Sequence, residues 1–277
     1  MSKVWFITGA SRGFGRAYAE EAVARGDFVV ATMRTVRTDD AFLQDGHILP
    51  VSMDVTDEAQ IAAAVQQAVD KFGRIDVLVN NAGFGFFGAF EETSDTELRA
   101  VMETNVFGVA SVTRAVIPVM RRQGSGRIIN IASRSGMIGE AGCTPYNAAK
   151  FAIVGLSEGL AEELSDFGIQ VMVACPGSFR TDFRDGSSKK EPKNLMPEYE
   201  GKLGHRALVG TREGNHKQAG DPKKAAKLIY EAANWERMPV KLMIGEDCCR
   251  DVTVKLARDI EEIQGYYSRS ADTKIDE

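Results

Sequence analysis

The stretch VWFITGASRGFG, Val4 to Gly15, opens with strand-like, mostly apolar sequence and continues directly into a glycine-rich turn. A helical pattern follows from Gly13 to Arg25, and Gly26 is placed to end it. A strand, a glycine-rich turn and a helix in immediate succession predict the first βα unit of a parallel sheet.

The same alternation of apolar strands and helical segments repeats along the 277 residues. The further predicted strands are Phe28–Met33, Ile48–Met53, Ile75–Val79, Arg127–Ile131, Ile169–Ala174 and Lys241–Ile244. The further predicted helices are Asp57–Phe72, Ser94–Arg122, a segment from near Tyr146 to Phe167, Asp221–Glu236 and a last helix ending near Gln264. This pattern predicts an α/β fold, a doubly wound, mostly parallel seven-stranded sheet of Rossmann type with helices on both faces.

No linker or shift in composition divides residues 1–265, so we expect a single domain. The segment Ser178–Gly220 is charged and glycine-rich and lacks clear periodicity. A loop of this length in a compact domain is usually functional or disordered, and we expect it to form a lid over a site. Residues 266–277 are expected to form a polar C-terminal tail.

The charge and composition exclude several classes of protein. The formal net charge is −5, so nothing indicates a nucleic-acid footprint. No apolar run approaches the roughly 18 residues of a membrane span, and the N-terminus enters a strand without a signal-peptide pattern. The four cysteines show neither metal-ligand spacing nor a disulfide framework. We therefore expect a cytoplasmic protein without a metal site.

The glycine-rich turn has the spacing of a phosphate-binding turn. Its glycines fall in the pattern G-x-x-x-G-x-G. Gly9 permits the tight turn, Gly13 lets the backbone approach a pyrophosphate, and Gly15 lets the helix pack closely on the strand. The following helix presents free N–H groups to an anion. Although a generic turn remains the alternative, its place between a strand and a helix favours dinucleotide binding.

The residues after the second predicted strand bear on the choice of nucleotide. Chains that bind NAD usually carry an acid there for the ribose 2′-hydroxyl, but this strand ends ATMRT, with Arg34 and no acid. Arg12 lies inside the turn, and Arg37 is a further candidate. Guanidinium groups suit a phosphate, so the sequence favours NADP(H) over NAD(H). The alternative is that these arginines are solvated surface charges.

The stretch CTPYNAAKFA, Cys143 to Ala152, places Tyr146 and Lys150 one helical turn apart on the same face. A nearby cation stabilises phenolate and lowers the pKa of a phenol, so this pair is suited to proton transfer. Packing beside a solvated charge is the alternative. Further short stretches follow predicted strands or lie on adjacent helices, at the edge where open α/β sheets bind ligands. They are Asp54, Val55, the NNAG run Asn80–Gly83, Asn105, Ser133 and the PGSFRT run Pro176–Thr181.

Taken together, these motifs resemble the short-chain dehydrogenase/reductase superfamily, specifically its single-domain oxidoreductases. The resemblance covers Val4 to about Gly265, and from KLMIG onward the chain is similar to the subgroup related to 17β-hydroxysteroid dehydrogenases. It implies that Tyr146 is the general acid or base, and that Lys150 lowers the phenol pKa and holds the nicotinamide ribose. It also implies that Ser133 orients the substrate oxygen and that Asn105 anchors a proton-relaying water.

The resemblance also implies a set of cofactor contacts around the turn, the strand ends and the catalytic helix. The predicted cofactor-binding residues are Gly9, Ser11, Arg12, Gly13, Phe14, Gly15, Arg34, Asp54, Val55, Asn81, Ala82, Gly83, Tyr146, Lys150, Pro176, Gly177, Phe179 and Thr181. Candidate substrate contacts are mostly apolar, which suits a steroid-like, acyl or aromatic ketone, although some of these residues could instead pack in the core. They are Phe84, Phe86, Phe87, Ser135, Cys143 and Phe183.

The sequence thus predicts an NADP(H)-dependent oxidoreductase that interconverts a ketone and a secondary alcohol. The alternatives are a non-catalytic NADP-binding sensor and an epimerase or dehydratase of the same fold. The resemblance also implies a homodimer or homotetramer that associates through the helices at 96–122 and 146–167. The substrate, its stereochemistry, the preferred reaction direction and the choice between dimer and tetramer stay open.

Overall fold

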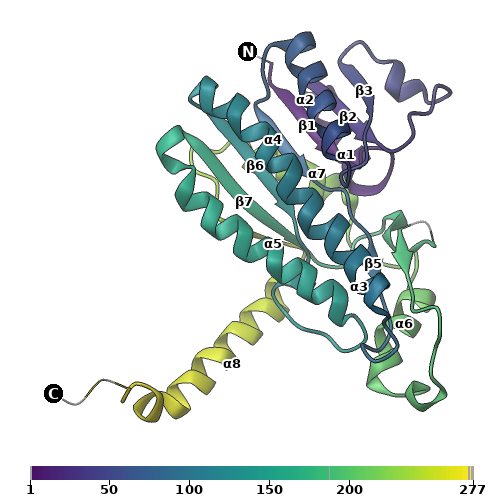
Figure 1. Cartoon of the computed structure of the whole chain (residues 1–277), viewed down its shortest axis with the longest axis vertical. Helices are drawn as coiled ribbons and strands as arrows, with labels where there is room; N and C mark the ends of the chain where they lie inside the picture. The colour runs from purple at the N-terminus through teal and green to yellow at the C-terminus, as the bar shows by residue number, and fades with distance from the viewer. Residues whose placement is uncertain (1, 187, 274, 276–277) are drawn as a thin grey trace.

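The computed structural model describes residues 2–186, 188–273 and 275. Its main sheet has seven strands in the order β3-β2-β1-β4-β6-β7-β9, and all neighbouring strands are parallel (Figure 1). The order changes direction between β1 and β4, which is the switch point of a doubly wound sheet. The predicted fold class is therefore confirmed. The strands are β1 (Val4–Thr8), β2 (Phe28–Met33), β3 (Ile48–Ser52), β4 (Val77–Asn80), β6 (Gly126–Ile131), β7 (Ile169–Pro176) and β9 (Lys241–Ile244).

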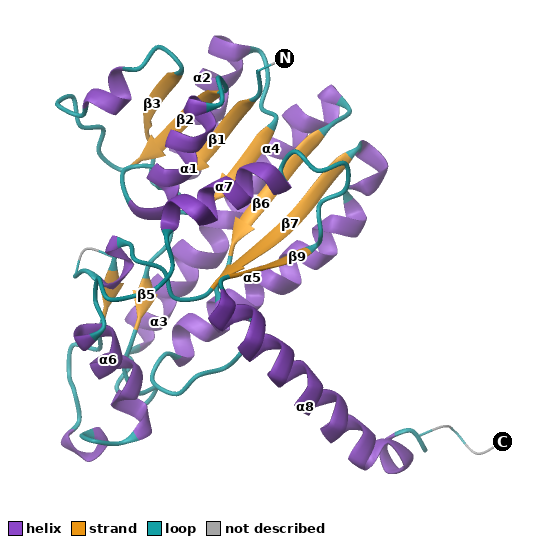
Figure 2. Cartoon of the chain, turned by 180° about the vertical axis from the view of Figure 1, so that it is seen from behind, coloured by secondary structure: helices purple, strands orange, loops and turns teal. Residues whose placement is uncertain are grey.

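Helices cover both faces of this sheet. On one face lie α1 (Gly13–Ala24) and α7 (Pro222–Ala232), which are in front in Figure 2. The other face carries α2 (Glu58–Phe72), α4 (Gly108–Gln123) and α5 (Thr144–Glu163), with α3 (Asp95–Met102) beyond them (Figure 1). Each layer buries its own apolar core against the strands, which is why the strands are apolar on both sides.

The helix boundaries follow from local capping. The Asp57 side chain accepts a hydrogen bond from the backbone N–H of Gln60 at the start of α2, and Gly73 ends that helix with a φ of 75°. Ser94 and Glu97 form a capping box at the start of α3. These caps satisfy backbone groups that a helix end leaves without partners.

The helix predicted over Ser94–Arg122 is interrupted. A π-helical turn, Glu103–Phe107, separates α3 from α4. Asn105 lies in this turn, and its side chain exchanges two hydrogen bonds with the backbone of Phe84. The extra residue of a π-turn redirects a side chain, and such turns are frequent at functional sites.

The segment Ser178–Gly220 contains regular structure that the sequence reading did not detect. It forms β8 (Lys189–Lys190), which pairs with β5 (Gly85–Phe86), and the helix α6 (Leu203–Glu213). These elements lie at the carboxyl end of the main sheet (Figure 1). The buried face of α6 is His205, Leu208 and Thr211, three residues apart. A histidine and a threonine on that face made its helical period hard to recognise.

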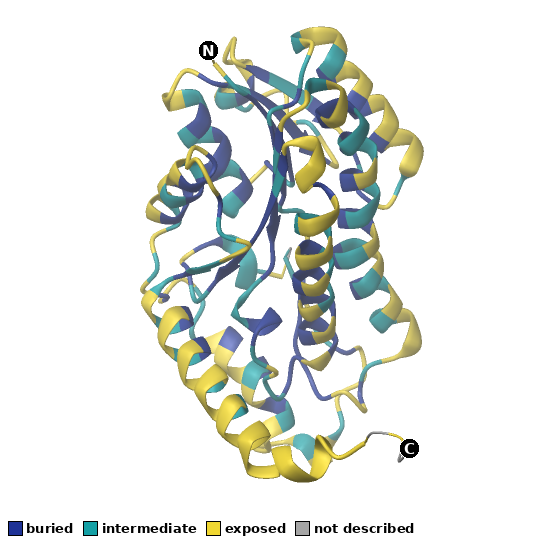
Figure 3. Cartoon of the chain, turned by 90° about the vertical axis from the view of Figure 1, so that its left-hand side faces the viewer, coloured by how far each residue is buried: buried dark blue, intermediate teal, exposed yellow. Residues whose placement is uncertain are grey.

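The last helix is longer than expected. Helix α8 runs over Glu246–Ser270, past the predicted end near Gln264 and into the expected tail. It contains one interior glycine, Gly265, which costs only about 1 kcal/mol and does not end a helix. Figure 3 shows most of α8 exposed, and its buried residues are Cys248 and Val252. Among the described residues, no helix has the length and apolar content needed to cross a bilayer.

Candidate active site

Two adjoining cavities lie at the carboxyl ends of the strands. The first, the turn groove, has a volume of about 290 Å³ and is lined by the glycine-rich turn and by residues after β2, β3 and β4. The second, the Tyr146 cavity, has a volume of about 330 Å³ and is lined by Tyr146, Lys150 and Ser133. The two cavities adjoin, because they share the wall residues Phe14, Asn81, Gly83, Thr181 and Phe183.

The glycine-rich turn is held against the end of β4. The Asn81 amide donates to the carbonyl oxygens of Thr8 (3.0 Å) and Gly9 (3.2 Å). A Cβ on Gly9 would lie 3.0 Å from the Cα of Ala82, and its φ of 69° also requires glycine. Gly15 does not line the turn groove. A Cβ there would overlap the carbonyl oxygen of Gly9, so the structure gives Gly15 the close-packing role expected from the sequence.

The N-terminus of α1 is open to a ligand. Arg12 is its N-cap residue in an extended conformation, no side chain caps the helix, and its first turn contains no acid. Free backbone N–H groups and the positive end of the helix dipole therefore face the turn groove. Together with the close backbone approach permitted by the glycines, this arrangement fits the pyrophosphate of a dinucleotide. The other predicted contacts lining this groove include Ser11, Gly13, Phe14, Asp54, Val55 and Ala82.

The arginines near β2 differ in their partners. The exposed side chain of Arg34 lines the turn groove, and among the described residues it makes no ion pair. Arg37 pairs with Asp39 at 2.8 Å and does not line the groove. Arg12 lines the groove and helps to hold the pKa of Asp185 low, after the larger effect of the Asn215 hydrogen bond. Arg34 is thus the arginine that the structure leaves most available to a phosphate.

The Tyr146–Lys150 pair is buried on α5. The two residues are 5% and 6% exposed, so the alternative of a solvated charge is excluded. The Lys150 ammonium lies 5.6 Å from the centre of the Tyr146 ring. It donates a hydrogen bond of 2.8 Å to the carbonyl oxygen of Ile131, at the end of β6. Burial lowers the pKa of Lys150 to about 8.

The pKa of Tyr146 moves in the direction opposite to the sequence expectation. Burial raises it above the ordinary value of 10.0, and hydrogen bonding with Ser133 opposes the rise only in part. The physical reason is that burial removes the water that would solvate phenolate. In the protein alone the phenol is therefore protonated at neutral pH, which is the state of a proton donor.

Ser133 and Asn105 occupy the remaining catalytic positions. Ser133 lies two residues after β6, and its hydroxyl accepts a hydrogen bond of 3.2 Å from the backbone N–H of Ser135. Asn105 is completely buried. A Cβ on Gly83 would overlap the Asn105 amide oxygen and would lie 3.9 Å from the Lys150 ammonium. The structure thus brings Asn105 and Lys150 together behind Gly83.

The segment Pro176–Thr181 forms one side of the Tyr146 cavity. The Gly177 N–H donates to the carbonyl of Ile244 at 2.8 Å, and the Ser178 N–H donates to Asp247 at 2.8 Å. The ring of Phe179 packs on Phe14, with centroids 5.2 Å apart. These contacts fix the segment beside Ser133 and Tyr146.

The predicted substrate contacts divide into three groups. Cys143, Ser135 and Phe183 line the Tyr146 cavity as expected, and Phe87 does so too. Burial raises the pKa of the Cys143 thiol to about 12, so it is a neutral part of the wall. The prediction for Phe86 is wrong, because this residue is 1% exposed and packs in the core with Val101 and Ala149. Phe84 lines the turn groove and is not among the residues that line the Tyr146 cavity.

The sequence reading missed two polar features. The first is a buried chain of hydrogen bonds in which Asn80 donates to Thr113 and Asn130, both at 2.8 Å, and Asn130 donates to Ser157 at 2.9 Å. Its signal was an asparagine at the end of each apolar run VLVN and RIIN. This chain joins β4, β6, α4 and α5, and so helps to position the catalytic helix.

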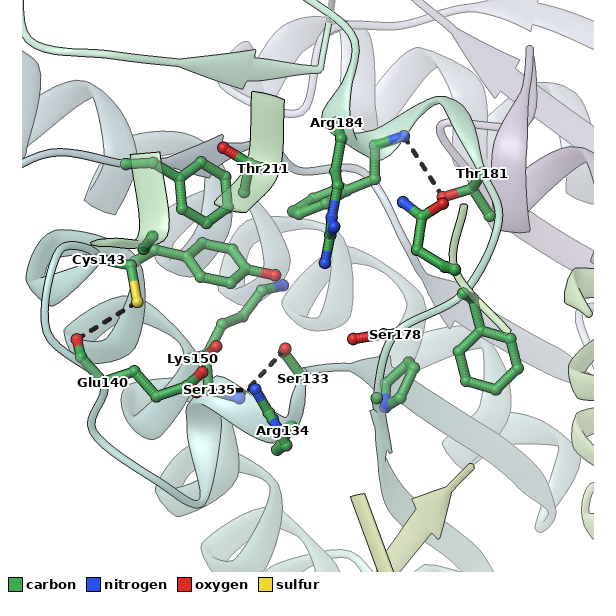
Figure 4. Close-up of a pocket in the computed structure, with 18 of the residues that line it drawn as sticks. Ser133, Arg134, Ser135, Glu140, Cys143, Lys150, Ser178, Thr181, Arg184 and Thr211 are labelled. Carbon is green, nitrogen blue, oxygen red and sulfur yellow. Dashed lines mark hydrogen bonds and ion pairs between the residues drawn. The ribbon is translucent and has the colours of Figure 1, made fainter. Parts of the chain in front are cut away.

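The second missed feature is a group of polar side chains from Ser178–Gly220 that line the Tyr146 cavity. They include Arg184, Arg206, Thr211 and Gln218. Figure 4 shows Arg184 and Thr211 on the side of the cavity opposite Ser133. The charged composition of the segment was visible in the sequence, but which charges face the site depends on the packing of α6.

The comparisons with known proteins agree with this geometry. A family model described as short chain dehydrogenase matches residues 3–192. The chain is 39% identical over 251 residues to "Oxidoreductase BOA17" of Botryotinia fuckeliana, and the match covers 89% of this chain and 90% of that relative.

Two solved structures are similar over nearly the whole chain. One is a short-chain dehydrogenase from Streptomyces avermitilis, with a TM-score of 0.90, 41% identity and coverage of 99% of this chain and 100% of that one. The other is a short chain dehydrogenase/reductase from Burkholderia phymatum in complex with NAD, with a TM-score of 0.81, 30% identity and coverage of 94% of each chain. The chain therefore belongs to the short-chain dehydrogenase/reductase family of oxidoreductases.

Proposed function

We propose that this protein is an NADP(H)-dependent oxidoreductase that interconverts ketones and secondary alcohols. The observation that carries the proposal is the burial of Tyr146 beside Lys150 and Ser133, in a cavity that adjoins the turn groove. A binding module that only senses a nucleotide has no need of a buried phenol and ammonium at the end of its groove.

The proposed roles follow from the charge that develops on a carbonyl oxygen during reduction. A bound nicotinamide would supply the hydride. Tyr146, whose raised pKa keeps it protonated, donates a proton to that oxygen, and Ser133 donates a hydrogen bond to it. Lys150 places a positive charge beside the phenol, and from the wall of the same cavity it would bind the cofactor ribose. Asn105 holds the backbone of Phe84 and anchors the water that relays protons from Lys150.

The proposed preference for NADP(H) rests on Arg34. This side chain lines the turn groove without an ion-pair partner among the described residues, and the positions directly after β2 carry no acid that would bind a ribose 2′-hydroxyl. Arg12 contributes a second guanidinium to the same groove. The relative in complex with NAD shows that members of this family also bind the other nucleotide, so the preference requires direct measurement.

The proposed substrate has a substantial apolar part. Phe87, Phe183 and Tyr146 form an aromatic cluster in the cavity, with ring centroids 5.7 to 6.5 Å apart. We infer that Ser178–Gly220 acts as the lid over this cluster, because it contributes Arg184, Thr211 and other residues to the cavity wall. A steroid-like, acyl or aromatic ketone suits such a wall.

The proposed assembly is a homodimer or homotetramer that forms through α4 and α5. Phe107, beside α4, is 55% exposed and Phe151 on α5 is 42% exposed, and large apolar side chains on adjacent helices favour association. The cysteines are all free, which supports a reducing, cytoplasmic setting.

The test of the proposed function is a calorimetric titration with NADPH and with NADH, followed by an activity screen with apolar ketones. We expect tighter binding of NADPH and consumption of NADPH with at least one ketone. Binding without turnover across a broad panel would favour a sensor, and tighter binding of NADH would contradict the role of Arg34.

A further inference from the structure

The Tyr146 cavity carries an excess of positive charge. Its charged side chains are Arg134, Glu140, Lys150, Arg184 and Arg206, which are four cations and one anion. The whole chain, in contrast, has a net charge of −5. A concave site with the opposite sign from the rest of the protein attracts ligands of the complementary charge.

Two of these cations already have a role. Arg134 pairs with Glu140 at 2.7 Å and with Asp251 at 2.5 Å, so its charge is balanced within the protein. Lys150 belongs to the proposed proton-transfer group. The unexplained charges are those of Arg184 and Arg206.

Arg184 is held in place but not neutralised. Its Nη1 donates to the carbonyl oxygens of Gly214 (3.2 Å) and Gly210 (3.5 Å), at the C-terminal end of α6. Among the described residues no carboxylate pairs with it, and its Nε and Nη2 donors have no acceptor. Burial and the charge of Arg134 lower its pKa, which is the mark of a cation that lacks a counter-charge. Figure 4 shows its side chain reaching into the cavity.

Arg206 contributes a second charge from α6 itself. Its side chain is exposed, lines the same cavity and forms no ion pair within the described part of the chain. Burial raises the pKa of the Cys143 thiol in the cavity wall, and the charge of Arg206 is one of the smaller effects that oppose the rise. Neither Arg184 nor Arg206 lines the turn groove, so neither is placed to bind the phosphates of a dinucleotide there.

We propose that Arg184 and Arg206 form a subsite for an anionic group of the substrate, so that the enzyme acts on oxo acids or oxo phosphates with an apolar body. The substrate class rests on the proposed function, whereas the anion subsite does not. Guanidinium groups bind carboxylate and phosphate through paired hydrogen bonds, and a half-buried arginine without a counter-charge is stabilised by such a ligand. Phe87 and Phe183 would contact the apolar body.

The subsite can be tested by binding alone. Hexanoate, hexyl phosphate and uncharged hexanamide share an apolar chain and differ in charge, and each is titrated calorimetrically into the full-length protein with and without NADP⁺. We expect at least one anion to bind roughly tenfold or more tightly than hexanamide, as charge-assisted hydrogen bonds require. The tighter of the two anions distinguishes a carboxylate subsite from a phosphate subsite.

Substitutions test whether the two arginines cause the preference for the anion over hexanamide. In Arg184→Gln/Arg206→Gln we expect the preference for the anion to fall to within about twofold. The single variant Arg206→Gln changes only an exposed side chain and should lower the preference several-fold without affecting folding. Arg212→Gln is the matched control, because Arg212 also lies on α6 but pairs with Glu191 outside the cavity. It should keep the full preference.

Equal binding of the anions and hexanamide by the wild-type protein would overturn the subsite, as would a preference that survives in the double variant. Neither result depends on turnover. A protein that binds the anion through these arginines but never oxidises NADPH would contradict the proposed function and leave the subsite intact.

Discussion

The ammonium of Lys150 lies 5.6 Å from the ring centre of Tyr146, and both side chains are buried. Burial acts on the two groups in opposite directions, since it disfavours the charged form of each. It raises the pKa of the phenol and lowers that of the ammonium to about 8. At neutral pH the phenol and the ammonium are therefore both protonated, which is the state needed to reduce a carbonyl. The buried positive charge of Lys150 lowers the stability of the folded protein.

The buried charge of Lys150 should lower stability at neutral pH. We expect Lys150→Met to abolish turnover and to raise the free energy of unfolding by about 1–3 kcal/mol at pH 7, as for other buried charges replaced by apolar groups. Loss of the hydrogen bond to Ile131 limits the gain. Chemical denaturation of both proteins measures the difference.

The pH dependence of this difference has a definite sign. Below about pH 8 the amine is protonated in both the folded and the unfolded wild-type chain, so the cost is constant. Between about 8 and 10.5 the unfolded chain holds a proton that the folded protein lacks, so wild-type stability rises with pH. The stability gap to Lys150→Met should therefore shrink across this window. A gap that stays constant from pH 7 to pH 10 would contradict the lowered pKa.

Ser133 is expected to stabilise charge on the substrate oxygen. Ser133→Ala should reduce kcat by about 10- to 1000-fold with a small effect on the Kd of NADPH, because a donor to the developing oxyanion acts mainly in the transition state. Ser135→Ala is the matched control, since Ser135 lines the same cavity two residues away. Similar losses in both variants would remove the distinction between the two serines.

Arg34 is expected to determine the preference between the two nucleotides. Arg34→Ala should weaken NADPH binding by about 10- to 100-fold, as loss of a charge-assisted contact implies, and should change NADH binding little. Arg37→Ala provides the control, because Arg37 pairs with Asp39 away from the groove. Equal weakening of NADPH and NADH by Arg34→Ala would show that no 2′-phosphate is bound there.

Gly83 is expected to tolerate no side chain. A Cβ at this position would overlap the Asn105 amide oxygen, so Gly83→Ala should displace Asn105 and lower kcat/KM by at least about tenfold. Gly139→Ala is a suitable control, because a Cβ there meets nothing within 4 Å. Wild-type kinetics in Gly83→Ala would show that the position of Asn105 does not matter for turnover.

The buried chain of hydrogen bonds through Asn130 is expected to contribute to stability. Asn130→Ala removes the acceptor for Asn80 and the donor to Ser157 in a site with no exposed surface. It should lower the free energy of unfolding by about 1–3 kcal/mol. The exposed Gln66→Ala should change it by less than about 0.5 kcal/mol. A neutral effect of Asn130→Ala would show that water or relaxation replaces the lost bonds.

Most of the fold was predictable because its signals are local. The predicted limits of β2 and β9 agree with the structure, and capping residues lie at the predicted helix starts Asp57 and Ser94. The π-turn at Glu103–Phe107 was not predictable, since its helical period continues through it and only the Asn105–Phe84 contact shows its purpose. Helix α6 was hidden because its buried face includes polar residues.

The candidate site was predictable where a motif fixes the backbone. The glycine-rich turn, Tyr146, Lys150 and Ser133 all line the two cavities as expected. The sequence FGFFG does not show which phenylalanine faces the cavity. In the structure Phe86 packs in the core, whereas its neighbour Phe87 packs against Tyr146. The pKa of Tyr146 was misjudged because its burial depends on Phe87 and Leu208, which lie far from it in the sequence.

The central claim is that Tyr146 donates the proton while a hydride passes to a carbonyl carbon. The most direct test uses NADPH carrying deuterium at both hydrogens of the nicotinamide C4, with an accepted ketone, and mass spectrometry of the alcohol. The account predicts one deuterium at the carbinol carbon with the wild-type protein and almost none with Tyr146→Phe, although that variant binds NADPH normally. Deuterated alcohol formed at the wild-type rate by Tyr146→Phe would contradict it.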